Sequence, residues 1–233
     1  MVDLTSEMAS LWAALGPAPA HRGRVLQFTA ANSGEGVSTV AREFARLAAV
    51  RARKPVWLVD ADLWGQSQME AIDAEPDRFG RLGAQAAASP DGSAFYTVSP
   101  PLIGRDGKPL APARLMIARP ALGGRLWVTR FRAESLRSGQ RAGPLPDAGY
   151  WNALRRHADT VIIDAPAADR SEMALTLAPF ADATVLVVAA ETTRASEPVG
   201  LRDEIEAAGG RMAGIVLNRM SWKPPGFLRR VTG

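Results

Sequence analysis

The stretch "ANSGEGVSTV", residues 31–40, lies between an apolar run, "RVLQFTA" (24–30), and a helical pattern, "AREFARLAAV" (41–50). Apolar side chains in this pattern recur on one helical face, and charged side chains fall on the other. Pro55 then prevents the helix from continuing into the next apolar run. These residues predict a strand that turns through a glycine-containing loop into an amphipathic helix.

The loop carries most of a phosphate-binding pattern, G-x-x-x-x-G-K-[ST]. Gly36 and Ser38 match it, Ala31 stands at the first glycine, and Val37 occupies the lysine position. Backbone N–H groups of such a loop attract anions without the lysine. The missing ammonium group matters more for catalysis, since one such donor contributes about 2.7–4 kcal/mol in a transition state. We therefore expect a strongly impaired site, with Arg42 or an arginine of a neighbouring chain as the alternative source of charge.

Short, almost wholly apolar runs alternate with helical patterns along the chain, as expected for strands that are buried on both faces. The runs are "RVLQFTA" (24–30), "PVWLVDAD" (55–62), "DTVIIDAP" (159–166), "ATVLVVAA" (183–190) and "AGIVLNR" (213–219). Strands that alternate with helices favour a parallel sheet. We therefore predict an α/β fold in which helices flank a doubly wound, mainly parallel sheet, in a single domain that spans residues 1–233.

The segment at about 80–150 interrupts this alternation and is rich in arginine, proline and glycine. We expect it to be an irregular insertion at one edge or end of the sheet, with a hairpin across 94–118. Residues 221–233 follow the last predicted strand and form a C-terminal tail.

Composition excludes several classes of site. The 233 residues include no cysteine and two histidines, so disulfides, thiolate catalysis and cysteine zinc sites are excluded. A metal ion would therefore be held by oxygen ligands. The sequence contains no apolar run long enough to cross a bilayer and no secretory signal pattern, so we expect a cytoplasmic protein.

Positive charge is concentrated in one part of the chain. Residues 105–156 contain eleven basic and three acidic residues, although the whole chain has a formal net charge of only +4. The tail mixes apolar Trp222 and Phe227 with Arg229 and Arg230. Such segments suit an anionic membrane surface or an acidic partner, and a solvated surface is the simpler alternative. We expect no nucleic acid, because no basic helix with interleaved aromatic residues is present.

Carboxylates end two of the predicted strands. Asp60 and Asp62 close the run at 55–62, and Asp164 closes the run at 159–166. Parallel sheets bind ligands at the carboxyl ends of their strands. We expect all three carboxylates to meet the loop there, where they could hold Mg²⁺ with Ser38 or orient an attacking hydroxyl group.

The segments "SGEGVST", "DADL", "VIIDAP", "FADATVLVVAAETTR" and "GIVLNRM" occur in this order along the chain. In order and spacing they resemble the Wzc-like bacterial tyrosine autokinases of capsule and exopolysaccharide synthesis. Those proteins belong with ParA and MinD among the deviant P-loop ATPases. The resemblance covers residues 25–66 and 150–220.

The resemblance implies a nucleotide site with Mg²⁺. By position, the residues that contact ATP or ADP would be Ser33, Gly34, Glu35, Gly36, Val37, Ser38, Thr39 and Asn218. The Mg²⁺ ligands would be Ser38, Asp60 and Asp164, and the catalytic carboxylates would be Asp60, Asp62 and Asp164. The implied partner is the cytoplasmic segment of a membrane-anchored polysaccharide co-polymerase, which would hold this chain peripherally at the inner membrane.

The chain also departs from the family pattern. It lacks the loop lysine, and it has only Tyr96 and Tyr150 where the family carries a tyrosine-rich tail. We therefore expect a non-catalytic or weakly nucleotide-binding component or regulator of exopolysaccharide assembly and export. An active ATPase or tyrosine kinase with an unusual loop is the first alternative, and a ParA- or MinD-like partitioning or positioning ATPase is the second. The oligomeric state stays open.

Overall fold

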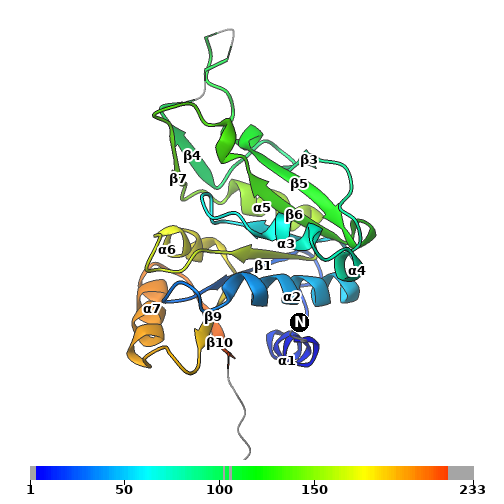
Figure 1. Ribbon diagram of the computed structural model, residues 1–233, viewed down its shortest axis with the longest axis vertical. Helices are drawn as coiled ribbons and strands as arrows, with labels where there is room; N and C mark the ends of the chain where they lie inside the picture. The colour runs from blue at the N-terminus through cyan, green and yellow to red at the C-terminus, as the bar shows by residue number, and fades with distance from the viewer. Residues whose placement is uncertain (1–3, 102, 105–106, 220–233) are drawn as a thin grey trace, which may run out of the picture.

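The computed structural model describes residues 4–101, 103–104 and 107–219 (Figure 1). The tail at 221–233, expected to contribute to docking, lies outside the described residues. The helices are α1 (Thr5–Leu15), α2 (Val37–Arg51), α3 (Gln68–Asp73), α4 (Pro76–Phe79), α5 (Gly149–His157), α6 (Met173–Leu177) and α7 (Ser196–Ala207). Within these described ranges, none of the helices combines the length and the apolar character that crossing a membrane requires.

The main sheet has eight strands in the order β10-β9-β1-β8-β2-β6-β5-β3. Its strands are β1 (Arg24–Thr29), β2 (Val56–Asp60), β3 (Ala86–Ala87), β5 (Met116–Ala121), β6 (Leu126–Phe131), β8 (Thr160–Asp164), β9 (Ala183–Ala189) and β10 (Met212–Asn218). The five apolar runs form β1, β2, β8, β9 and β10, which all pair in parallel. The predicted α/β fold with a mainly parallel sheet is confirmed.

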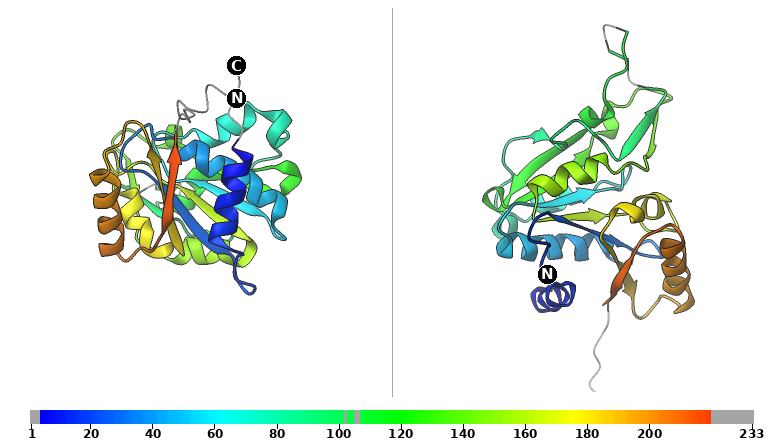
Figure 2. Two further views of the ribbon diagram at one scale, coloured as in Figure 1. Left: turned by 90° about the horizontal axis from the view of Figure 1, so that it is seen from below. Right: turned by 180° about the vertical axis from the view of Figure 1, so that it is seen from behind.

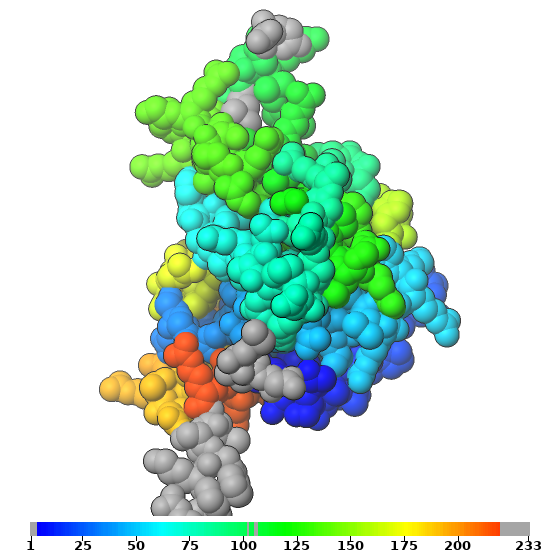
Figure 3. All heavy atoms as spheres, turned by 45° about the vertical axis from the view of Figure 1, so that its right-hand side comes forward, coloured from blue at the N-terminus to red at the C-terminus, as the bar shows by residue number. Residues whose placement is uncertain are grey.

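The segment at 80–150, expected to be irregular, contains regular β-structure. β6 pairs in parallel with β2, and β5 and β3 add antiparallel strands beyond it. A separate two-stranded sheet consists of β4 (Tyr96–Ser99) and β7 (Arg141–Pro144). β4 and β7 lie at the upper end of the molecule in Figure 1, and Tyr96 and Val98 of β4 pack in the same apolar core as α5 (Figures 1 and 3).

The hairpin expected across 94–118 is wrong as a strand pair. β4 pairs with β7, and β5 pairs with β6. Within the segment that connects β4 to β5, Ile103 and Pro109 form an isolated antiparallel bridge. The reason is that these strands find partners far away in the sequence, which no local pattern of turn residues reveals.

Alternate residues of the central strands face two separate apolar cores. Leu26 and Phe28 of β1 pack on the side of α1 and α2. Val25 of the same strand packs on the other side with Trp151 and Leu154 of α5. The sheet therefore lies between two layers of helices, as the two further views show (Figure 2).

α2 runs from the loop after β1, at one end of the sheet, to the opposite end of the sheet. It begins directly after Gly36, where the left-handed backbone (φ 92°) turns the chain out of the loop. Val40 and Phe44 are buried against the sheet. At its other end the guanidinium of Arg125 donates hydrogen bonds to the carbonyls of Val50 (2.8 Å) and Ala52 (3.3 Å). These bonds satisfy carbonyls that the end of a helix leaves without partners.

Candidate phosphate-binding site

The loop at 31–36 joins β1 to α2 and forms one wall of a pocket of about 310 Å³. Gly36 is required there for two reasons. Its φ of 92° is unfavourable for other residues, and an added Cβ would lie 2.2 Å from Nδ2 of Asn218. The first N–H groups of α2 have no intrahelical partners and can bind an anion.

Most of the predicted site residues meet at this pocket. Those that line it are Ser33, Gly34, Glu35, Gly36, Val37, Ser38, Thr39, Asp62 and Asp164. Asp60 and Asn218 are not among the lining residues. Arg42 is not among them either, and its guanidinium donates to Oε1 of Gln68 (3.2 Å). Among the described residues, Arg42 therefore does not supply the charge of the missing loop lysine to this pocket.

Glu35 and Asn218 hold the loop against the ends of β9 and β10. The buried carboxylate of Glu35 accepts hydrogen bonds from the backbone N–H groups of Asn32 and Ala189, both at 3.1 Å, and from the hydroxyl of Thr193. The side-chain amide of Asn218 donates to the carbonyl of Glu35 at 2.8 Å. Both predicted nucleotide contacts are thus engaged in the loop's own structure.

Val37 contributes to the apolar core. Its side chain is 8% exposed and belongs to the cluster that includes Val40 and Phe44. The side chain of neighbouring Ser38 instead donates to Asp164 at the end of β8, and its carbonyl accepts the side-chain amide of Gln68 at 2.8 Å. The lysine position therefore holds a packed apolar side chain while the rest of the loop keeps its place beside the sheet.

Asp60 stabilises the loop that follows β2. Its Oδ1 accepts the backbone N–H of Asp62 (3.2 Å), and its Oδ2 accepts those of Ser67 (3.0 Å) and Gln68 (3.1 Å). Burial raises the pKa of Asp60 well above its ordinary value, and the charge of Asp164 raises it further. The three backbone hydrogen bonds act in the opposite direction.

Asp164 brings a buried carboxyl to the pocket from the end of β8. It is 3% exposed and lies in register with Asp60 across β8 and β2. Its Oδ2 accepts the amide of Gln68 at 2.6 Å, and the side chain of Ser38 also donates to it. Burial raises the pKa of Asp164 to about 6, against the effect of these two hydrogen bonds. A carboxyl in a pocket with a displaced pKa is a common feature of functional sites.

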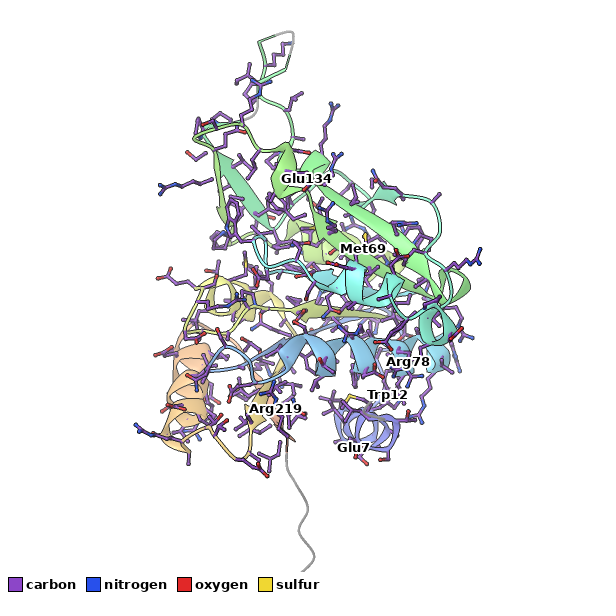
Figure 4. All side chains as sticks on the ribbon, viewed as in Figure 1. Glu7, Trp12, Met69, Arg78, Glu134 and Arg219 are labelled. Atoms are coloured by element: carbon purple, nitrogen blue, oxygen red, sulfur yellow. The ribbon has the colours of Figure 1, made fainter. Side chains whose placement is uncertain are left out.

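Asp62 is held by an arginine. Its Oδ2 forms an ion pair with Arg170, and its Oδ1 accepts the backbone N–H of Gly65 at 2.8 Å. Arg170 lines the pocket, as does Arg219 directly after β10 (Figure 4). Two cationic side chains therefore face the loop from other elements.

Sequence reasoning did not identify Gln68, Arg170 or Arg219. Gln68 joins α2 to β8 through Ser38 and Asp164, yet a glutamine eight residues after Asp60 carries no motif. Arg170 and Arg219 were two of many arginines in the chain. Only their positions in the folded chain distinguish them from the others.

A Mg²⁺ ion suits part of the predicted ligand set. Ser38 and Asp164 lie together at the pocket, and Mg²⁺ commonly binds one or two carboxylates together with phosphate oxygens and water. Asp60 fits less well because both of its oxygens accept backbone hydrogen bonds. Among the described residues, no group of three or more His, Cys, Asp or Glu side chains could by itself hold a metal ion.

No family model matches the chain, and no curated protein matches it. Solved structures, in contrast, do match the chain. The kinase domain of VpsO has 18% sequence identity and a TM-score of 0.57, over 85% of this chain and 86% of that chain. The kinase domain of Escherichia coli tyrosine kinase Etk has 16% identity and a TM-score of 0.58, over 95% and 75%.

An ATP complex of McdA from Cyanothece has 16% identity and a TM-score of 0.55, over 85% of this chain and 71% of that chain. The chain therefore has the fold of bacterial tyrosine kinase domains, which it shares with McdA.

Proposed function

We propose that this chain is a divergent relative of the polysaccharide-synthesis tyrosine kinases that acts without catalysis, or with weak nucleotide binding, in exopolysaccharide assembly and export. The observation that carries the proposal is the packing of Val37. An apolar side chain at the lysine position, 8% exposed, supplies no charge to a phosphate group. Loss of one such donor lowers a rate by roughly a hundredfold or more.

Both tyrosines support this proposal. Tyr96 and Tyr150 are each 1% exposed. The hydroxyl of Tyr96 donates to the carbonyl of Pro112 at 2.7 Å, and that of Tyr150 donates to the carbonyl of Ala88 at 3.3 Å. Burial raises the pKa of both hydroxyl groups. We therefore infer that neither residue accepts phosphate in the folded chain.

An active ATPase or kinase with an unusual loop is the second candidate. It is favoured by Arg170 and Arg219, which line the same pocket as the loop and could replace the charge of the lysine. Arginine binds phosphate with a planar, bidentate group, so its geometry would differ from that of the family lysine. In this candidate ATP with Mg²⁺ is the substrate, and Asp164 orients the reacting groups.

The partner in the first candidate is the cytoplasmic segment of a membrane-anchored polysaccharide co-polymerase. Association with it would place the chain peripherally at the cytoplasmic face of the inner membrane. The support is the similarity of fold to tyrosine kinase domains, together with the excess of basic residues at 105–156.

Calorimetric titration with Mg²⁺-ATP and Mg²⁺-ADP, combined with a phosphate-release assay, distinguishes the two candidates. Absent or weak binding without hydrolysis supports the first. Sustained hydrolysis that Asp164→Asn, Arg170→Gln and Arg219→Gln each abolish supports the second and contradicts the first. Ser135→Ala is the matched control, because Ser135 is an exposed residue outside the pocket.

A further inference from the structure

A second cleft lies at the other end of the sheet. It has a volume of about 480 Å³ and is formed where α1 and α2 end and where β1 and β8 begin. The phosphate loop lies at the opposite ends of these strands, and the two pockets share no lining residue. We call it the basic cleft, after its cationic lining residues Arg22, Arg51, Arg53 and Lys54.

The charge of the basic cleft is largely uncompensated. Asp159 is its one carboxylate, and that side chain already accepts the hydroxyl of Thr160 at 3.1 Å. Arg22 is paired with Asp182 outside the lining (3.0 Å). Arg51, Arg53 and Lys54 are exposed, and none of their side chains has an ion-pair or hydrogen-bond partner among the residues that the structure describes.

The end of α2 does not account for these cations. Basic residues often stabilise the carbonyl groups at a helix C-terminus. Here Arg125, which comes from a different part of the chain, already donates to the carbonyls of Val50 and Ala52. Arg51, Arg53 and Lys54 therefore remain available to an external anion.

Part of the wall of the basic cleft is apolar. It contains Trp12 of α1 (Figure 4) and the exposed prolines Pro17 and Pro19. Trp12 is fixed from behind by Arg24, whose guanidinium carbon lies 4.8 Å from the ring centroid. Arg24 is 4% exposed, and its Nη1 donates to the carbonyl of Gly16 at 2.5 Å. A preformed wall of this kind lowers the entropic cost of binding.

We propose that the basic cleft binds an acidic peptide segment of a partner protein. Carboxylates of the segment pair with Arg51, Arg53 and Lys54, and an aromatic or aliphatic side chain packs on Trp12 and the prolines. The concave shape favours an extended peptide, because a flat lipid surface reaches only the rim of a cleft. The proposal concerns a different surface from the nucleotide pocket, so it stands or falls independently of the proposed function.

Fluorescence anisotropy with a labelled acidic peptide, EDEWEDEE, tests the proposal, and the neutral peptide QNQWQNQQ is the probe control. The test variant is R51E/R53E/K54E. The control variant R81E/R137E/R211E changes the net charge equally at exposed positions outside the cleft. Unchanged circular dichroism and melting temperature show that both variants fold.

We expect the wild-type chain to prefer the acidic peptide, and we expect affinity to fall about tenfold or more in the cleft variant. The control variant should change affinity less than about threefold. Equal losses in the two variants, or no binding to the wild-type chain, overturn the proposal. Co-sedimentation with phosphatidylglycerol vesicles and titration with a single-stranded oligonucleotide complete the test. Cleft-dependent binding to either of these without binding to the peptide also overturns it.

Discussion

Asp60 and Asp164 lie side by side, in register at the carboxyl ends of β2 and β8, and both carboxyl groups are buried. Gln68 connects this pair to the phosphate loop. Its backbone N–H donates to Asp60 (3.1 Å), and its side-chain amide donates both to Asp164 (2.6 Å) and to the carbonyl of Ser38 (2.8 Å). The first turn of α2 is therefore joined to two strand ends by one uncharged residue, through its side-chain amide and its backbone N–H.

Asp164 makes the stability of the protein depend on pH. Burial raises its pKa from 3.8 to about 6, so at intermediate pH the folded chain keeps a proton that the unfolded chain has released. The free energy of unfolding therefore falls as pH rises from about 4 to about 6. Asp164→Asn should reduce this slope and increase stability at neutral pH by roughly 1–3 kcal/mol.

Urea denaturation across this pH range measures the effect of Asp164→Asn. Asp73→Asn is the control, because Asp73 is exposed. Part of the slope should remain in the test variant, since burial also raises the pKa of Asp60. An unchanged slope in Asp164→Asn would contradict the assignment of the pH dependence to this carboxyl.

Gln68→Ala should destabilise the protein by roughly 1–3 kcal/mol, because it removes one hydrogen bond from each of two acceptors that are buried or partly buried. These acceptors are the carbonyl of Ser38 and Oδ2 of Asp164. Removing the amide should also raise the pKa of Asp164 further, since its hydrogen bond favours the charged form. Urea denaturation at neutral pH gives the first quantity, and NMR titration of the Asp164 carboxyl gives the second. Gln85→Ala, at an exposed position, should leave both unchanged.

Val37→Lys should raise the affinity for Mg²⁺-ATP by about tenfold to a hundredfold, because a charge-assisted hydrogen bond contributes about 1.5–3 kcal/mol. Calorimetry measures the affinity. Val37→Met is the matched control, with a long side chain but no charge. Both variants should melt at a lower temperature than the wild type, because Val37 belongs to the core. Equal affinities for the two variants would show that a lysine at this position does not reach the phosphate groups.

Incubation with radiolabelled Mg²⁺-ATP should leave both tyrosines unmodified. The hydroxyls of Tyr96 and Tyr150 are buried and hydrogen-bonded, so a kinase site cannot reach them without local unfolding. Mass spectrometry of the purified chain locates any label. Phosphate on either tyrosine that disappears in Asp62→Ala would instead demonstrate autophosphorylation by this chain.

The sequence by itself determined the parallel core and the place of the phosphate loop. Apolar β-branched runs such as β1 and β8 are buried on both faces, and this local composition identifies them without knowledge of their partners. The glycine-containing turn after β1 is also a local pattern, so it identified the loop without knowledge of tertiary contacts. Asp62 and Asp164 then met at the pocket because parallel strands end at the same edge of a sheet.

Only the tertiary structure decided how the strands within 80–150 pair and which contacts the side chains of the site make. The strands within 80–150 pair with distant segments, as β4 does with β7, so their local sequence does not reveal their partners. Three contacts of the site likewise depend on side-chain positions. Asp60 accepts a hydrogen bond from the loop after β2, Gln68 donates to Asp164, and Asp62 pairs with Arg170. Hydrogen bonds and ion pairs act over a few ångströms in space, and residues that are far apart in the sequence come within that distance only when the chain folds.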